Sequence, residues 1–204
     1  MRHYRIISLL LSSFLLSSCV YHKLSSYKKR SDYTFPSGKF NNVEKAIKYK
    51  TSIDVLNKHF TGLIIFKKTD AETRHVVFVT ELGMTMFDFV IKGDSMTPVS
   101  VFEGLNKPQT INALIRNFET IFMVKWGNKN LEKREKSGKV ALYLKEGKHE
   151  RFVIDGGEKE SAEQWVFYKR KKETRTTYSP EFEHIKLKQY GLVKLYIEMD
   201  KINE

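Results

Sequence analysis

The chain has 204 residues, a formal net charge of +12, one cysteine and 41% hydrophobic residues. One cysteine excludes an internal disulfide, and the length is sufficient for one domain with a single core. A sequence pI near 9.6 is typical of nucleic-acid-binding proteins. The same charge also suits anionic lipid headgroups, acidic polysaccharides or acidic proteins, or it serves only to keep the surface soluble.

The N-terminus has the pattern of an export signal. Arg2 and Arg5 precede an apolar run from Ile6 to Leu16, which is shorter than the roughly 20 residues of a membrane-spanning helix. A charged start, a short apolar middle and small residues at the end are typical of a secretory signal peptide. We therefore expect residues 1–18 to be a signal peptide, whose removal lowers the formal charge from +12 to +10.

The four residues Leu16-Ser17-Ser18-Cys19 resemble the lipobox of bacterial lipoproteins. The resemblance implies cleavage before Cys19, a diacylglycerol on its sulfur and usually a third acyl chain on its amine. A catalytic thiol would instead need a formed pocket, which the end of a signal peptide does not supply. Two or three acyl chains hold a protein stably on a membrane. The alternatives are an uncleaved anchor and a cytoplasmic protein with a misleading start.

Lipoprotein sorting gives the expected compartment. Val20 follows the cysteine in place of the aspartate that is associated with inner-membrane retention, and no acidic run comes after it. We therefore expect an outer-membrane protein that faces the periplasm, with the membrane as a partner and no nucleic acid. Residues 19–39 are polar, basic and interrupted by Pro36-Ser37-Gly38, and predict a flexible tether.

Residues 40–204 predict one domain of mainly β structure. Alternating or continuous apolar runs separated by turn residues indicate many short antiparallel strands. These runs are Ile47–Val55, Phe60–Lys68, Arg74–Thr80, Thr85–Lys92, Thr97–Phe102, Val140–Lys145, Arg151–Ile154, Trp165–Arg170, Arg175–Tyr178, Phe182–Lys188 and Leu192–Met199. One segment has helical spacing, with apolar residues at Ile111, Leu114, Ile115, Phe118, Ile121 and Phe122. It predicts an amphipathic helix at about 107–122, capped by Asn106.

The middle strands are apolar on both faces, so both faces should be covered. We expect a strongly curled, unclosed antiparallel barrel whose concave side is closed partly by the helix and partly left as an apolar hollow. The candidate lining is Leu63, Ile65, Phe78, Met84, Met86, Asp88 and Val90. Asp88 would be a polar anchor for a headgroup, or a partly exposed residue near a bend or paired with a lysine. The alternative to a hollow is a conventional, filled two-layer core.

This layout resembles the lipoprotein-localisation (LolA/LolB-like) fold of lipid-handling envelope proteins. The resemblance runs from Ile47 to Met199, through YKTSIDVLNKHFTGLIIFKK, ELGMTMFDF and LNKPQTINALIRNFETI. It implies a half-barrel whose apolar hollow accepts acyl chains. These stretches also look like a group of envelope lipoproteins of unassigned role.

A basic run joins two of the predicted strands. Lys169, Arg170, Lys171 and Lys172 predict a hairpin tip, which is either a solvated loop or a contact for lipid headgroups. The common hydrolase, phosphate-loop and zinc motifs are not found in the sequence. We therefore expect no catalytic residues, no metal and no cofactor, and a protein that is not an enzyme.

Two functions fit these features. In the first, an envelope lipoprotein holds a lipid or an acylated protein in its hollow, in lipid or lipoprotein transport. In the second, a structural or interaction subunit with a filled core acts through its basic surface on an envelope protein partner.

Overall fold

The computed structural model describes residues 20–30, 40, 46–55, 57–126, 131–137, 139–155, 161–191 and 193–203. Residues 20–25 form a short helix. The strands and remaining helices are β1 Lys28–Arg30, β2 Ile47–Val55, β3 Lys58–Lys68, β4 Thr73–Thr80, β5 Thr85–Lys92, β6 Ser95–Val101, η1 Glu103–Leu105, α3 Pro108–Ile121, η2 Val124–Trp126, β7 Glu132–Lys136, β8 Lys139–Glu146, β9 His149–Asp155, β10 Ala162–Tyr168, β11 Lys171–Tyr178, η3 Pro180–Phe182, β12 His184–Gln189 and β13 Leu195–Lys201.

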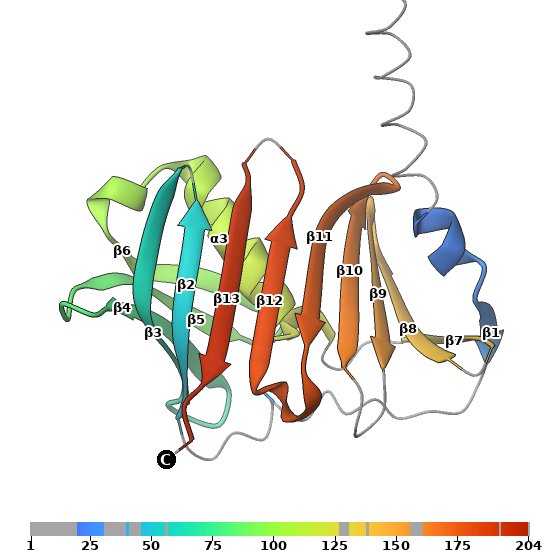
Figure 1. Cartoon of the computed structure of the whole chain (residues 1–204), viewed down its shortest axis with the longest axis horizontal. Helices are drawn as coiled ribbons and strands as arrows, with labels where there is room; N and C mark the ends of the chain where they lie inside the picture. Colours follow the sequence, from blue (N-terminus) through green and yellow to red (C-terminus); the bar gives the residue numbers. More distant parts are fainter. Residues whose placement is uncertain are drawn as a thin grey trace, which may run out of the picture.

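All of these strands belong to one antiparallel sheet. Its order is β1-β7-β8-β9-β10-β11-β12-β13-β2-β3-β4-β5-β6, so β1 and β6 are its edges and the sheet does not close into a barrel. The half that contains β2 to β6 curls round α3, while β7 to β10 extend away from the helix (Figure 1). The predicted fold class, a curled and unclosed antiparallel sheet with one long helix, is confirmed.

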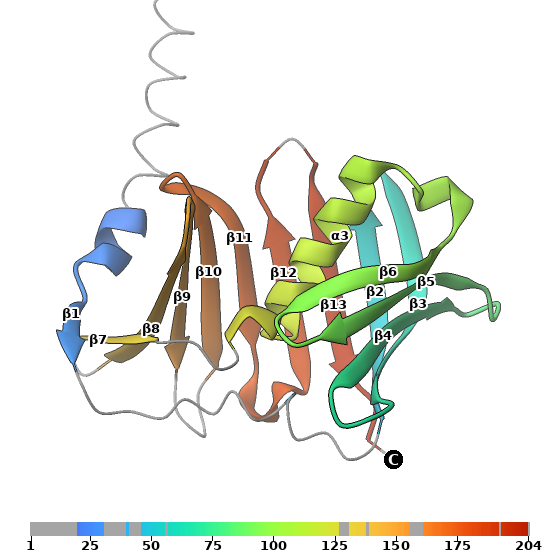
Figure 2. The ribbon, with the colours of Figure 1, turned by 180° about the vertical axis from the view of Figure 1, so that it is seen from behind.

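Helix α3 crosses the concave side of the sheet (Figure 2). It covers residues 108–121, within the predicted segment of 107–122. The predicted cap is not the observed one: the N-cap is Lys107, whose side chain makes no capping bond, and Pro108 occupies the first turn. The apolar stripe of α3 faces the sheet, because Leu114, Phe118 and Ile121 are all buried.

Aromatic rings fill the space between α3 and the sheet. Phe118 lies 5.2 Å from the Phe87 ring, and Phe122 stacks on Phe66 at 4.6 Å. Phe87 and Phe89, which come from the same strand, stack at 4.5 Å. Offset-stacked and tilted rings at these distances add to the stability that burial provides. The inner face of β3 to β5 is therefore packed with side chains.

A second core lies on the other face of the sheet. Leu24 and Tyr27 pack against a group of side chains from β8, β9 and β10, which are Ala141, Tyr143, Phe152, Trp165 and Phe167. Strand β1 then pairs with β7. In residues 20–30 the structure thus differs from the predicted tether. We call residues 20–27 the clamp segment. Residues 31–39 lie outside the described part of the chain.

The outer face of β3 to β5 also differs from expectation. We predicted cover on both faces, but Leu63 is 37% exposed and Ile65, Val77, Val79 and Val90 are half-buried. Apolar residues on both sides of a strand reflect strand propensity as well as burial, because β-branched side chains suit the extended backbone. Apolar residues on both sides of a strand therefore do not distinguish a covered face from a partly solvent-exposed one.

The aromatic packing predicts a large effect of one truncation. Phe118→Ala should lower the free energy of unfolding by about 3–5 kcal/mol, because it leaves a cavity between α3 and β5. Phe118→Leu, which keeps most of the volume, should cost clearly less. Urea denaturation followed by tryptophan fluorescence measures both. Equal, small effects of the two variants would contradict a filled inner face.

Candidate functional site

The seven residues predicted to line a hollow do not share one face. Phe78 and Met86 are fully buried in the core beneath α3. Cross-strand pairing places Leu63 opposite Val79, and Ile65 opposite Val77, on the outer face. Asp88 and Val90 lie on that outer face too, through their pairing with Val77 and His75, and Met84 is 46% exposed beside the β4–β5 turn. These residues cannot form a common lining.

Asp88 has a partner on the outer face. Its Oδ1 lies 2.8 Å from Nδ1 of His75, and both side chains are about one-fifth to one-quarter exposed. A register shift occurs next to it, between Asp88 and Phe89. Asp88 is thus a partly exposed residue at an irregularity, paired with a histidine and not with a lysine.

Polar groups lie on the inner face beneath the other end of α3. Arg151, Thr174 and Gln189 are buried there, and Arg151 Nη1 lies 3.2 Å from Glu146. Burial lowers the pKa of Arg151, against the effect of the nearby carboxylates. The side-chain oxygens of Asn117 and Thr174 have no hydrogen-bond partner in the described protein. They line a cavity of about 10 Å³, which has room for about one water molecule. Because this part of the inner face is polar, it is poorly suited to binding an acyl chain.

The clamp segment is also held by polar contacts. Cys19 itself lies outside the described residues, but Tyr21 donates a hydrogen bond of 2.8 Å to Glu150. Tyr143 donates to the same carboxylate at 3.0 Å, and the Arg134 guanidinium lies 3.7 Å above the Tyr143 ring. Burial and the Glu150 carboxylate raise the pKa of Tyr21. The chain next to the predicted lipid attachment is therefore fixed to the sheet.

The predicted basic run forms a tight turn between β10 and β11. Lys169 and Arg170 have φ angles of 48° and 65°. Two successive left-handed residues define a type I′ turn, which favours Asn-Gly and costs about 1–2 kcal/mol for each residue with a β-carbon. The Lys169 amide donates to the Lys148 carbonyl at 2.9 Å, which fastens this turn to the β8–β9 turn. Two cations thus occupy backbone positions that do not suit them.

The cations beside this turn lie over aromatic rings on the outer face. Arg170 lies 5.8 Å from the Tyr21 ring, and Lys172 lies 4.9 Å from Trp165 and 4.5 Å from Tyr190. Such contacts stabilise a cation without neutralising its charge. Burial, followed by the neighbouring Arg175 and Lys188, lowers the pKa of Lys172. Positive charges are therefore crowded together here.

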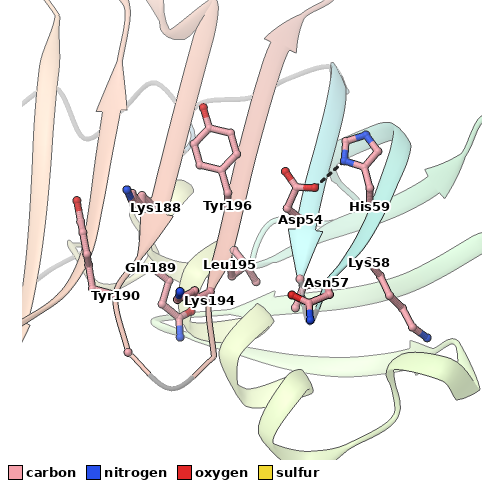
Figure 3. Close-up of a pocket in the computed structure, with 12 residues that line it drawn as sticks. Asp54, Asn57, Lys58, His59, Lys188, Gln189, Tyr190, Lys194, Leu195 and Tyr196 are labelled. Carbon is pink, nitrogen blue, oxygen red and sulfur yellow. Dashed lines mark hydrogen bonds and ion pairs between the residues drawn. The ribbon is translucent and has the colours of Figure 1, made fainter.

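A groove of about 720 Å³ continues this surface, between the end of β2 and the β12–β13 connection. Its residues are Asp54, Val55, Asn57, Lys58, His59, Lys188, Gln189, Tyr190, Gly191, Lys194, Leu195 and Tyr196. Figure 3 shows Tyr196 standing between Lys188 and Asp54, and Asp54 turned toward His59, whose Nδ1 is 2.6 Å away. The groove and the basic turn meet at Tyr190, because Lys172 and Lys188 both lie over its ring.

One row of cross-strand neighbours joins the clamp to the groove. Directly paired residues in an antiparallel sheet point to the same face. The row crosses the outer face through Phe152, Trp165, Arg175, Lys188, Tyr196, Asp54 and His59. We call it the outer row. It begins beneath the clamp segment and ends in the groove, so both belong to one continuous surface.

These features also lie at one end of the sheet. The start of the helix at residues 20–25, the β10–β11 turn, the β12–β13 connection and the β2–β3 turn are all at the upper end in Figure 1, whereas the C-terminus is at the lower end. The carboxylates of Glu198 and Asp200 lie further along β13 and pair with Lys186 and His184. The acids of this part of β13 are therefore already paired with cations.

The groove was not predicted from the sequence. Lys58 and Lys194 are far apart in the chain and line the same groove only because β13 pairs with β2, with Leu195 opposite Val55. The tyrosines at 190 and 196 were visible as strand-end residues but carried no signal of a site. Strands β1 and β7 were missed for another reason: their sequences, KKR and EKREK, contain no apolar residue.

No protein-family model matches this chain, and no curated protein matches it. Among the described residues, no helix is long and apolar enough to cross a membrane. In the same part of the chain, no three His, Cys, Asp or Glu side chains are grouped as metal ligands. The site is accordingly defined by its charge, its rings and its position.

The clamp segment yields a local prediction. Leu24→Ala removes the buried side chain that holds residues 20–27 to β8–β10, and a buried leucine truncation costs about 2–5 kcal/mol. Hydrogen exchange at the amides of Lys28–Arg30 and β7 should accelerate, while exchange in α3 stays unchanged. Ser25→Ala, one residue away and outside the second core, is the control. Unchanged exchange in the leucine variant would mean that the segment is held by something else.

Proposed function

We propose that this chain is a cell-envelope lipoprotein, acylated on Cys19 and located in the outer membrane facing the periplasm. It acts by binding rather than by catalysis. The signal-like start and the LSSC tetrapeptide support the anchor. The clamp segment supports a defined orientation for such an anchor, because the chain that follows Cys19 packs against β8 to β10.

The favoured mode of action is interaction through the basic surface. The observation that carries it is the common position, at one end of the sheet, of the helix at residues 20–25, the basic turn and the two connections that bound the groove (Figure 1). Anionic headgroups attract basic residues that lie within a Debye length of the membrane. Lys169, Arg170, Lys171 and Lys172 are the headgroup contacts, next to the acyl chains. An envelope protein partner would bind the part of the outer face that points away from the membrane.

A second candidate function is the holding of a lipid or an acylated protein within the curled sheet. The apolar, unclosed half-barrel favours it. It would require α3 to move, because Phe118 and Phe122 occupy the inner face. We therefore rank it second.

Acylation is tested on protein purified from a Gram-negative host. The wild-type chain should begin at Cys19 and carry two or three fatty acyl chains in its mass spectrum, whereas Cys19→Ser should carry none and keep residues 1–18. Ser18→Ala, which retains a small residue before the cysteine, should process normally. An unmodified wild-type chain would refute the anchor. Native spectra of the same material show whether a non-covalent lipid is also bound, as the second candidate requires.

Substitutions in the strained β10–β11 turn should change vesicle binding and the free energy of unfolding in different ways. Lys169→Asn with Arg170→Gly should raise the free energy of unfolding by about 1–2 kcal/mol, since Asn-Gly suits a type I′ turn. It should weaken binding of the chain from Val20 onward to phosphatidylglycerol vesicles by about fivefold for each charge removed.

Lys169→Ala with Arg170→Ala is the matched control for this turn. It removes the same charges but keeps the strain, so vesicle binding should fall equally without a gain in stability. Unchanged vesicle binding by both double variants would exclude the turn as a headgroup contact.

A further inference from the structure

We propose that the groove between the β2–β3 turn and the β12–β13 connection is a phosphate site for an anionic lipid headgroup. This assignment concerns residues other than the basic turn, and its placement near the membrane rests on the proposed function. The groove volume of about 720 Å³ falls within the range of ligand-binding clefts.

The charges of the groove favour an anion. Lys58, Lys188 and Lys194 are exposed, and no carboxylate among the described residues lies within ion-pair distance of them. The one acid in the groove, Asp54, is directed at His59. The ammonium groups are therefore available, and a phosphate is the kind of ligand that lysines bind as point charges.

Crowding of like charges strengthens this preference. Lys172 and Lys188 share the Tyr190 ring, at 4.5 and 5.5 Å from its centre. Arg175 already pairs with Glu163, but the mutual repulsion of Lys172 and Lys188 is relieved when an anion enters between them. The acids further along the face, Glu198 and Asp200, already have cationic partners. A negative ligand is thus attracted to the lysines of the groove, which have no carboxylate partner among the described residues.

The surface and position of the groove select a lipid as the source of the phosphate. Val55 and Leu195 are directed into the inner core, so the apolar part of the groove surface is formed by the half-buried rings of Tyr190 and Tyr196. A glycerol or proximal methylene group can lie on such a surface beneath a phosphate. The β2–β3 turn and the β12–β13 connection, which bound the groove, lie at the same end of the sheet as the helix at residues 20–25 (Figure 1). Headgroups of the membrane that holds Cys19 are therefore within reach.

The test uses the chain from Val20 onward, which contains every described element of the fold. Its binding to vesicles of phosphatidylcholine with and without 30% phosphatidylglycerol is measured by sedimentation. Lys58→Gln, Lys188→Gln and Lys194→Gln together should weaken binding to the anionic vesicles by about fivefold per lysine, on the order of a hundredfold in all. Binding to neutral vesicles should be weak for every variant.

The matched control removes equal charge at the opposite end. Lys67→Gln, Lys68→Gln and Lys92→Gln lie at the far ends of β3 and β5, so this triple variant should retain most of the binding. Equal losses in both triple variants would show that only net charge matters and would overturn the site. Retained binding in the groove variant would do the same. Thermal denaturation confirms that both are folded, since exposed lysines outside special contacts change stability little.

Two further outcomes are decisive. Titration with inorganic phosphate, followed by amide NMR shifts of residues 57–59 and 188–191, should give only weak effects. Saturation by millimolar phosphate that also abolishes vesicle binding would identify free phosphate as the ligand and overturn the lipid assignment. Because this chain carries no acyl group, the vesicle result and the acylation result can fail independently.

Discussion

The pairing of β13 with β2 is the contact on which the rest of the structure depends. It joins the first half of the sheet, β2 to β6, to the half built from β7 to β12, with Leu195 opposite Val55 and Ile197 opposite Ile53. These strands come from opposite ends of the domain, so the pairing forms only after the chain has closed a long loop. It creates the concave surface that α3 crosses, and it brings the two walls of the groove together.

The two faces of the sheet are stabilised by different devices. On the inner face, α3 contributes a row of rings that interlocks with Phe66 and Phe87. On the outer face, the clamp segment covers only β8 to β10. The rest of the outer face remains partly exposed to solvent. This part includes the apolar side chains of β3 to β5 and the charged residues of the outer row. The interior thus supplies stability, and the features suited to binding are concentrated on the outer face and at one end.

The sequence predicted the regular elements better than the site. The bounds of β2, β5 and α3 follow from periodicity to within one residue. The predicted lining of a hollow failed because its residues were assigned to one face without knowledge of their cross-strand partners. Ile64, not Leu63, lies opposite Phe78, so Leu63 and Phe78 fall on opposite faces. The register shift at Phe78/Val79 makes Met86 an extra residue of β5, which is buried like Phe87. The clamp was missed because its two core residues, Leu24 and Tyr27, are scattered among polar ones. The groove depends on tertiary pairing, which local spacing does not encode.

Under the proposed function, an ordered segment next to the lipid attachment changes what a basic surface can do. A lipoprotein on a long tether samples many orientations, so each surface meets the membrane only part of the time and its effective concentration there is low. Here Leu24, Tyr27 and the Tyr21–Glu150 hydrogen bond hold the chain to the sheet from residue 20 onward. Acyl chains on Cys19 would then bring the basic turn and the groove to the headgroups together. The weak contacts of these basic residues with headgroups would then add to the membrane affinity that the acyl chains provide. The proposed orientation would leave the lower end of the sheet, where β13 ends and charges are paired, directed away from the membrane.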